Sequence, residues 1–229
     1  MPIIHDEEFG KVTIRRSARA TQVRLRVGPD GTLRASLPLY APAFLVKRLI
    51  KASRDELRTL LQQSAPVIAY EDGMRIGKSH ALHVREGIDL AVKRKDQRIE
   101  VTLPPTMSLE HPEVVKKLRE ATQAALRIEA KSYLPKRLSY LATQLGHVYS
   151  SVRFSHASGR WGSCTSEGTI SLNIALMKLP FELIDYVIIH ELAHTKHLNH
   201  SQAFWEEVER GDPQYELHRR ALKLESPTI

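Results

Sequence analysis

Four of the eleven histidines in this 229-residue chain lie within one stretch of eleven residues, which also contains a glutamate. The stretch reads His190-Glu191-Leu192-Ala193-His194-Thr195-Lys196-His197-Leu198-Asn199-His200. On a helix, His190 and His194 lie about 6 Å apart along the axis and roughly 40° apart around it, so both rings reach one point. Imidazole nitrogens bind zinc at about 2.1 Å, and this spacing therefore predicts a Zn2+ site.

The neighbouring residues supply candidates for the rest of such a site. Glu191 lies about 100° around the helix from His190, too far to complete the ligand set but close enough to act as a general base on a water molecule. A catalytic zinc usually has three protein ligands. His197 lies on the same face, but about 10 Å along the axis from His190. If the helix ends near residue 198, with Asn199 in the left-handed conformation, His200 returns towards the metal. We therefore predict His190, His194 and His200 as ligands, with His197 as the alternative third ligand.

The elements around this stretch are predicted from periodicity and turn residues. An apolar face predicts a helix over 181–198, beginning after Pro180. Strands are expected over 148–155, 160–164 and 169–174, the last two joined by a turn at 166–168. A long helix is predicted from Pro112 to Leu145, stopped by Gly146 and kinked or broken at Pro135. Residues 106–229 are thus expected to form a C-terminal domain with a small antiparallel sheet and an active-site helix.

Residues 1–105 are expected to form a separate, β-rich domain with one helix. Strands are predicted over 11–16, 22–27 and 32–37, the last two forming a hairpin around Pro29-Asp30-Gly31. One amphipathic helix follows from Pro42 to about Pro66. Further strands are predicted over 81–84, 88–92 and 99–103. The whole chain is therefore assigned to the α+β class.

Other residues near the histidines have two interpretations each. Cys164 could be a nucleophile with a histidine base, but a small buried thiol fits its strand context better. The strand over 169–174 is either an edge along which an extended peptide pairs or an interior strand. A donor for an oxyanion could come from any of four residues, between which the sequence does not choose: Arg160, Asn173, Tyr186 and His197.

Composition limits the class of protein. Cys164 is the single cysteine, which excludes an internal disulfide and a cysteine-rich zinc site. The first twenty residues do not read as a signal peptide, and no apolar run is long enough for a membrane span. We therefore expect a cytoplasmic protein without a membrane partner, whose oligomeric state the sequence leaves open.

The net charge of +8 is unevenly distributed, since residues 1–137 hold 26 Lys/Arg against 16 Asp/Glu and the remainder hold 8 against 10. Such an excess of base is consistent with affinity for nucleic acid or for acidic partners. It is also typical of a solvated basic surface. The lack of aromatic residues between the basic ones favours this second interpretation.

Several short motifs together resemble one family of proteins. They are Arg160-Trp161-Gly162-Ser163-Cys164, Gly168-Thr169-Ile170-Ser171-Leu172-Asn173, His190-Glu191-Leu192-Ala193-His194, Asn199-His200-Ser201 and Phe204-Trp205. These motifs, spanning about residues 150–206, resemble the YgjP-like metallopeptidases, which are related to the SprT/Spartan and Wss-like metalloproteases. The resemblance implies a zincin-like domain over 106–229, zinc ligands at His190, His194 and His200, and a catalytic Glu191.

The expected function is hydrolysis of peptide bonds in a peptide or protein substrate, with water activated by zinc and Glu191 as the general base. The label of peptidase comes mainly from the resemblance. One alternative is a zinc-dependent hydrolase of a non-peptide substrate such as a nucleotide phosphoanhydride, although no glycine-rich phosphate loop supports it. Another is a nucleic-acid-associated protein with a structural metal, but a closed structural site has no use for the base Glu191.

Overall fold

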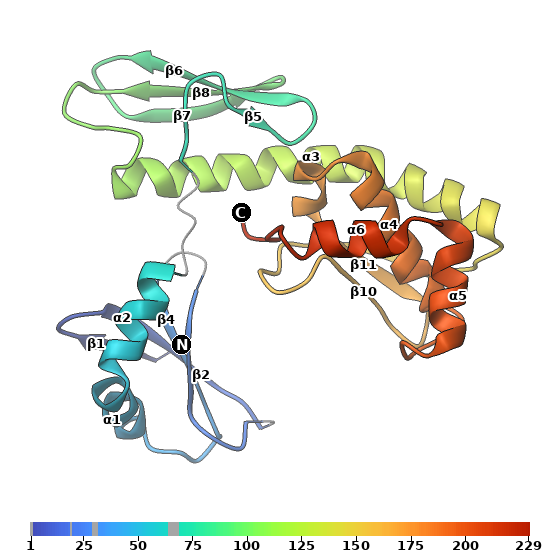
Figure 1. The fold of residues 1–229 in the computed structure, drawn as a ribbon. Helices are drawn as coiled ribbons and strands as arrows, with labels where there is room; N and C mark the ends of the chain where they lie inside the picture. The colour runs from blue at the N-terminus through green and yellow to red at the C-terminus, as the bar shows by residue number, and fades with distance from the viewer. Residues whose placement is uncertain (1, 19, 29–31, 64–68) are drawn as a thin grey trace. The chain divides into compact units, whose positions relative to one another are not determined.

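A computed structural model describes residues 2–18, 20–28, 32–63 and 69–229. The chain has an α+β fold that divides into two compact units, residues 1–68 and residues 69–229 (Figure 1). The sequence placed this boundary near residue 105. The difference arises because residues 69–105 pack against the long helix that follows them. Within the described ranges, no helix combines the length and apolar composition needed to cross a bilayer.

The first unit is a four-stranded mixed sheet with two helices on one face. Its elements are β1 (Ile3–Asp6), β2 (Gly10–Arg16), β3 (Arg24–Val27), β4 (Leu33–Leu37), α1 (Phe44–Ala52) and α2 (Arg54–Gln63). The sheet order is β1-β2-β4-β3, with β2 and β4 parallel and the other pairs antiparallel. The predicted hairpin of β3 and β4 is confirmed, while its turn at 29–31 lies outside the described residues. Two helices replace the single one predicted, because Ser53 ends α1 and its carbonyl accepts the N–H of Leu57 in α2.

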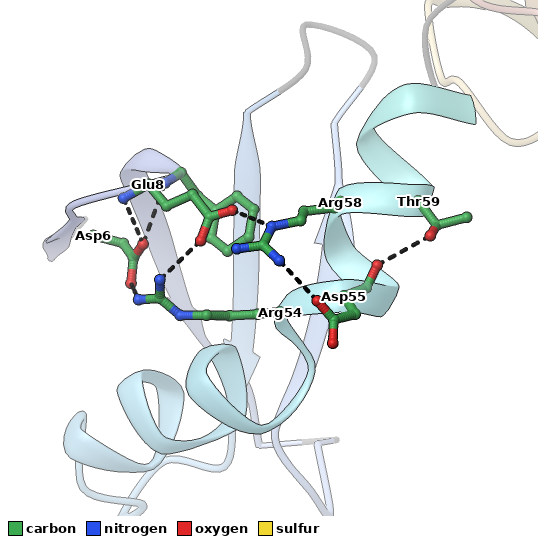
Figure 2. Close-up of polar contacts among 7 residues, drawn as sticks. Asp6, Glu8, Arg54, Asp55, Arg58 and Thr59 are labelled. Carbon is green, nitrogen blue, oxygen red and sulfur yellow. Dashed lines mark hydrogen bonds and ion pairs between the residues drawn. The ribbon is translucent and has the colours of Figure 1, made fainter.

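Alternation along the strands directs one apolar row towards the helices. Val12 and Ile14 of β2 and three residues of β4 pack with Val46, Ile50 and Leu57 of the helices in one buried cluster. Ion pairs close the edge of this layer, where Arg54 pairs with Asp6 and Glu8, and Arg58 with Glu8 and Asp55 (Figure 2). The unit therefore has its own hydrophobic core, with a group of ion pairs at the edge of that core.

The second unit begins with a sheet packed on a long helix. The strands are β5 (Arg75–Ile76), β6 (His80–Glu86), β7 (Ala91–Lys95) and β8 (Arg98–Leu103), in the order β5-β6-β8-β7. The helix is α3 (Pro112–Leu145), whose buried Glu129 accepts hydrogen bonds from the backbone N–H groups of Lys78 and Ser79 at 2.7 and 2.9 Å. These bonds, with Leu82, Ile99 and Val101 fully buried, attach the sheet to the C-terminal half of the chain.

Helix α3 follows the predicted bounds. It begins at Pro112 and ends at Gly146, which caps it in the left-handed conformation with φ 67°. Of the kink or break expected at Pro135, the break does not occur, since α3 continues through that residue. Lys131, whose carbonyl loses its usual N–H partner there, is exposed, so water can satisfy that carbonyl.

The remaining elements surround the histidine stretch. A three-stranded sheet has the order β10-β11-β9, from β9 (Ser151–Ser155), β10 (Gly162–Cys164) and β11 (Thr169–Asn173). This sheet is mixed rather than antiparallel as predicted, because β9 runs parallel to β11. A 3-10 helix η1 (Ile174–Lys178) leads to α4 (Phe181–Ala193), α5 (Gln202–Gly211) and α6 (Tyr215–Leu222).

Helix α4 ends one turn earlier than predicted. The N–H groups of Thr195 and Lys196 bond to the carbonyls of Leu192 and Ala193, three residues back, which tightens the last turn. Asn199 does not have the left-handed conformation expected of it, since Asp96 is the non-glycine residue with positive φ in the described ranges. The chain instead turns back gradually over residues 194–200.

Candidate metal centre

Three imidazoles converge where α4 gives way to α5. One ring nitrogen from each of His190, His194 and His200 lies within 4.8 Å of the others. The Nε2 atoms of His190 and His200 are 3.2 Å apart. Ligand atoms of a tetrahedral zinc with bonds of about 2.1 Å are roughly 3.4 Å apart. The pair His190 and His200 thus has the separation that one small cation requires, and His194 lies within 4.8 Å of both.

Hydrogen bonding fixes the orientation of His194. Its Nδ1 lies 3.0 Å from the carbonyl oxygen of His197, so Nδ1–H donates and the lone pair of Nε2 is left for a metal. His197 therefore contributes its main chain to the site, and its ring is not part of the ligand cluster. Of the two candidates for the third imidazole, His197 and His200, it is His200 that the turn after α4 brings to the cluster.

The protonation of the rings suits metal binding. Burial, followed by the charges of His194 and His200, lowers the pKa of His190 to about 3. Burial and His194 likewise lower the pKa of His200. Neutral imidazole is the form that binds metal, so these rings need lose no proton at neutral pH.

Aromatic contacts position the exposed third ring. Trp205 of α5 stacks on His200 with ring centroids 5.6 Å apart and an interplanar angle of 23°. Trp205 also stacks on Tyr215 at 5.5 Å, and the guanidinium of Arg219 lies 4.4 Å from the Trp205 centroid. The buried ring of Phe204 contacts the rings of all three histidines at 4.5 to 4.9 Å. Residues of α5 and α6 therefore fix a ligand that lies outside any helix.

Glu191 lies in a space that a glycine provides. Its carboxylate is buried, and a Cβ placed on Gly162 would lie 2.5 Å from Glu191 Oε1 and 2.7 Å from its Cγ. No side chain larger than hydrogen fits at position 162 unless Glu191 moves. Gly162 appeared in the sequence as part of a motif, but the need for its missing side chain is visible only in the packing of β10 against α4.

The chemistry of Glu191 also suits a neighbouring cation. Burial raises the pKa of Glu191 to about 8, an effect that the positive charge of Arg160 partly opposes. Glu191 Oε2 is buried without a hydrogen-bond partner in the protein. A buried carboxylate of this kind needs a positive charge or a water molecule beside it. Three converging imidazoles and a buried carboxyl oxygen without a partner together fit a divalent metal.

A polar cluster ties the metal centre to α3. Glu207 of α5 lies 2.8 Å from Lys196 Nζ and 2.9 Å from His147 Nε2, and it also pairs with Arg210. The other ring nitrogen of His147 lies 3.1 Å from the hydroxyl of Thr195. Burial, followed by the charge of Lys196, lowers the pKa of His147 to about 4. This cluster spans the chain on either side of His200 and limits how far that ligand can move.

Other residues weighed from the sequence have structural roles. The Asn173 side chain donates to the carbonyls of Ala157 and Arg160 and accepts from the N–H of Ala175, so it is not free to stabilise an oxyanion. Burial and the charge of Glu191 raise the pKa of Cys164, which disfavours a thiolate nucleophile.

The interpretation of residues 169–174 as a strand edge is wrong, because β11 is the middle strand of its sheet. The strand beside the site is β10. Within the part of the chain that is described, β10 pairs with β11 on one side and with no strand on the other.

Comparison with known proteins places this site in a family. The model of the YgjP-like family, described as a metallopeptidase domain, matches residues 21–225. The chain belongs to the YgjP-like family. This membership covers both units and supports a metal-dependent peptidase at the level of the family.

Among solved structures, the chain is similar to the metallopeptidase zymogen abylysin of Pyrococcus abyssi, with 30% identity. The match covers 39% of this chain and 91% of that one, with a TM-score of 0.36. A comparison with curated protein sequences gives no match.

Proposed function

We propose that this YgjP-like protein is a zinc-dependent peptidase in which His190, His194 and His200 bind the metal and Glu191 is the general base. The observation that carries the proposal is the convergence of three imidazoles within 4.8 Å beside the buried carboxyl group of Glu191. Zinc is favoured over harder cations because all three ligands are imidazole nitrogens.

Each residue then has a distinct part in the reaction. When bound, zinc supplies Lewis-acid chemistry, which polarises a carbonyl and makes a water molecule more acidic. Glu191 accepts the proton of the attacking water and passes it to the leaving amine. Gly162 keeps the carboxylate in place by leaving space for it.

The free side of β10 supports a peptide as the substrate. An extended peptide can pair with an unpaired strand edge through main-chain hydrogen bonds, whatever its side chains are. Because Gly162 begins β10 and touches Glu191, a peptide on that edge would pass close to the general base. A nucleoside triphosphate would gain nothing from a strand edge.

The test compares wild type with Glu191→Gln, with zinc content measured in both. Glu182→Gln is the matched control, since Glu182 is an exposed carboxylate at the start of the same helix. We expect wild type and Glu182→Gln to cleave members of a peptide library. Glu191→Gln should retain zinc and lose at least about 100-fold in rate.

Two results would overturn the proposal. One is peptide cleavage that persists in zinc-loaded Glu191→Gln. The other is hydrolysis of nucleoside triphosphates by wild type, lost in Glu191→Gln, with no peptide cleaved under any condition.

A further inference from the structure

The sheet of the first unit has one face that its helices do not cover. Alternation along β2 directs Val12 and Ile14 into the core, and Lys11, Thr13 and Arg15 to the opposite side. The same alternation applies to β3 and β4, whose outward positions are Arg24, Arg26, Arg34 and Ser36. The outward positions of β1 are Ile3 and His5.

Five cations therefore share this surface, which we call the basic sheet face: Lys11, Arg15, Arg24, Arg26 and Arg34. All five are exposed. Arg26 lies directly opposite Arg34 across the antiparallel pair, and Ser36 lies between Arg15 and Arg24 in neighbouring strands. Adjacent strands are about 4.8 Å apart, so these charges are close neighbours.

No acidic residue occupies an outward strand position on this face, among the residues described. Three acidic side chains of the unit, Asp6, Glu8 and Asp55, lie instead on the helical side, where they pair with Arg54 and Arg58 (Figure 2). The unit thus separates its charges, with paired acids on one side and a concentration of basic side chains on the other.

We propose that the basic sheet face binds the phosphate backbone of nucleic acid. Arginine is suited to phosphate because its planar guanidinium donates two parallel hydrogen bonds, and the hydroxyls of Thr13 and Ser36 add donors between the cations. None of the outward strand positions is Phe, Tyr or Trp, so the imidazole of His5 is the one ring that the described strands place on this face. The binding is therefore independent of sequence and strongly dependent on salt.

This function is separate from peptide hydrolysis, since the basic sheet face lies in the first unit and the metal centre in the second. Nucleic acid binding needs no metal. It should persist in EDTA, which removes zinc and peptidase activity together, so failure of either proposal can be recognised without the other.

The experiment measures binding of the full chain to a fluorescent random-sequence DNA duplex by anisotropy, at salt concentrations from about 50 to about 200 mM. The test variant replaces Arg15, Arg24 and Arg26 with glutamine. The matched control replaces Lys47, Arg48 and Lys51 with glutamine, three exposed cations of α1 away from the sheet face, so both variants lose the same net charge. A third variant places lysine at the three arginine positions.

We expect the test variant to bind at least about tenfold more weakly, and its salt slope to fall by roughly 0.9 for each phosphate that the protein no longer neutralises. The α1 variant should stay close to wild type, the lysine variant should lose less affinity than the glutamine variant because it keeps the charge, and all variants should melt at the same temperature. Equal reductions in affinity for the test and α1 variants would overturn the proposal, because net charge alone would then explain binding. It would also be overturned if wild type bound phosphatidylserine vesicles or free nucleoside triphosphates but no nucleic acid.

Discussion

The three imidazoles of the metal centre are fixed in three different ways. His190 lies half-buried on α4 against the ring of Phe204, and His194 is held by its hydrogen bond to a backbone carbonyl. His200 is exposed and lies outside any helix, so its position depends on stacking against Trp205 and on the fold of the turn. The third ligand is therefore the most dependent on tertiary structure.

Replacing each candidate for the third ligand separates them directly. His200→Ala should weaken zinc binding by more than about 100-fold, since removal of outer-shell partners alone costs about 10–100-fold. His197→Ala should bind zinc like wild type, because the carbonyl that accepts from His194 belongs to the main chain. Competition with a chromophoric chelator measures both affinities. The assignment is wrong if His197→Ala shows the larger decrease.

Gly162 offers a second test at the level of one residue. Gly162→Ala would place a Cβ 2.5 Å from Glu191 Oε1, so the carboxylate must move. We expect peptide cleavage to fall roughly 100-fold while zinc binding is retained, because a displacement of about 1 Å at a reacting group costs this much. Gly159→Ala is the control, since a Cβ there meets nothing within 4 Å. Equal rates in the two variants would contradict the steric argument.

At the scale of elements, start and stop residues in the sequence predicted those helix ends that the local backbone determines. The bounds of α3 were predictable because Pro112 and Gly146 are start and stop residues that act through their own backbone. The end of α4 was not, since Thr195, Lys196 and His197 are all compatible with a helix. The contacts that accompany its end are the bond from His194 to the His197 carbonyl and the contact between Thr195 and His147. The parallel pairing of β9 with β11 also escaped prediction, because no local residue specifies a distant partner.

The convergence of the three histidines was predictable for a related reason. His190 and His194 follow from helical spacing alone, and His200 from the need for a chain reversal after them. The space around Glu191 and the ring that stacks on His200 come from β10 and α5, which approach the site only through tertiary packing.

The ion pairs of Glu207 lead to a prediction about how much this residue of α5 contributes to stability. Burial raises the pKa of Glu207, but hydrogen bonds from Lys196 and Arg210 outweigh it and lower the pKa to about 2. A carboxyl with a lowered folded-state pKa adds stability that is complete above its unfolded pKa of about 4.3 and is lost as pH falls towards about 2. Glu207→Gln should therefore reduce the free energy of unfolding at neutral pH, by on the order of 1 kcal/mol after solvent screening.

Urea unfolding at several pH values measures this effect. The difference between wild type and Glu207→Gln should shrink below about pH 4.3, the unfolded-state pKa of glutamate. Glu206→Gln, which changes the neighbouring exposed carboxylate, should differ little from wild type at any pH. A difference for Glu207→Gln that stays constant down to about pH 3 would refute the electrostatic explanation.

At the scale of the whole molecule, the chain consists of two units with separate cores. Residues 1–68 contain twelve Lys/Arg against six Asp/Glu, so most of the net charge of +8 belongs to the first unit. The sequence showed this asymmetry but not its boundary, because residues 69–105 are rich in strands as the first unit is. Their attachment to α3 through Glu129 is a tertiary property.

The division into units predicts the behaviour of a fragment. A chain of residues 69–229 should fold cooperatively and bind one zinc ion with the affinity of the full chain, since all three ligands and their supports lie within it. Circular dichroism melting and zinc titration check both points. A fragment of residues 106–229, which lacks β5–β8, should be much less stable because it exposes the apolar side of α3. Similar melting temperatures for the two fragments would contradict the observed boundary.

The hydrogen bond from His194 to the carbonyl of residue 197 has a consequence for how the site tolerates mutation. Every amino acid carries a backbone carbonyl, so nearly any side chain at position 197 can support the ligand. Proline is the expected exception, because it would remove the N–H that bonds to Ala193. In a saturation scan, most substitutions at position 197 should therefore preserve zinc binding, whereas substitutions at position 194 should abolish it. This difference is expected although the two residues share one hydrogen bond. Sequence variability among relatives would give no sign that residue 197 supports the metal centre.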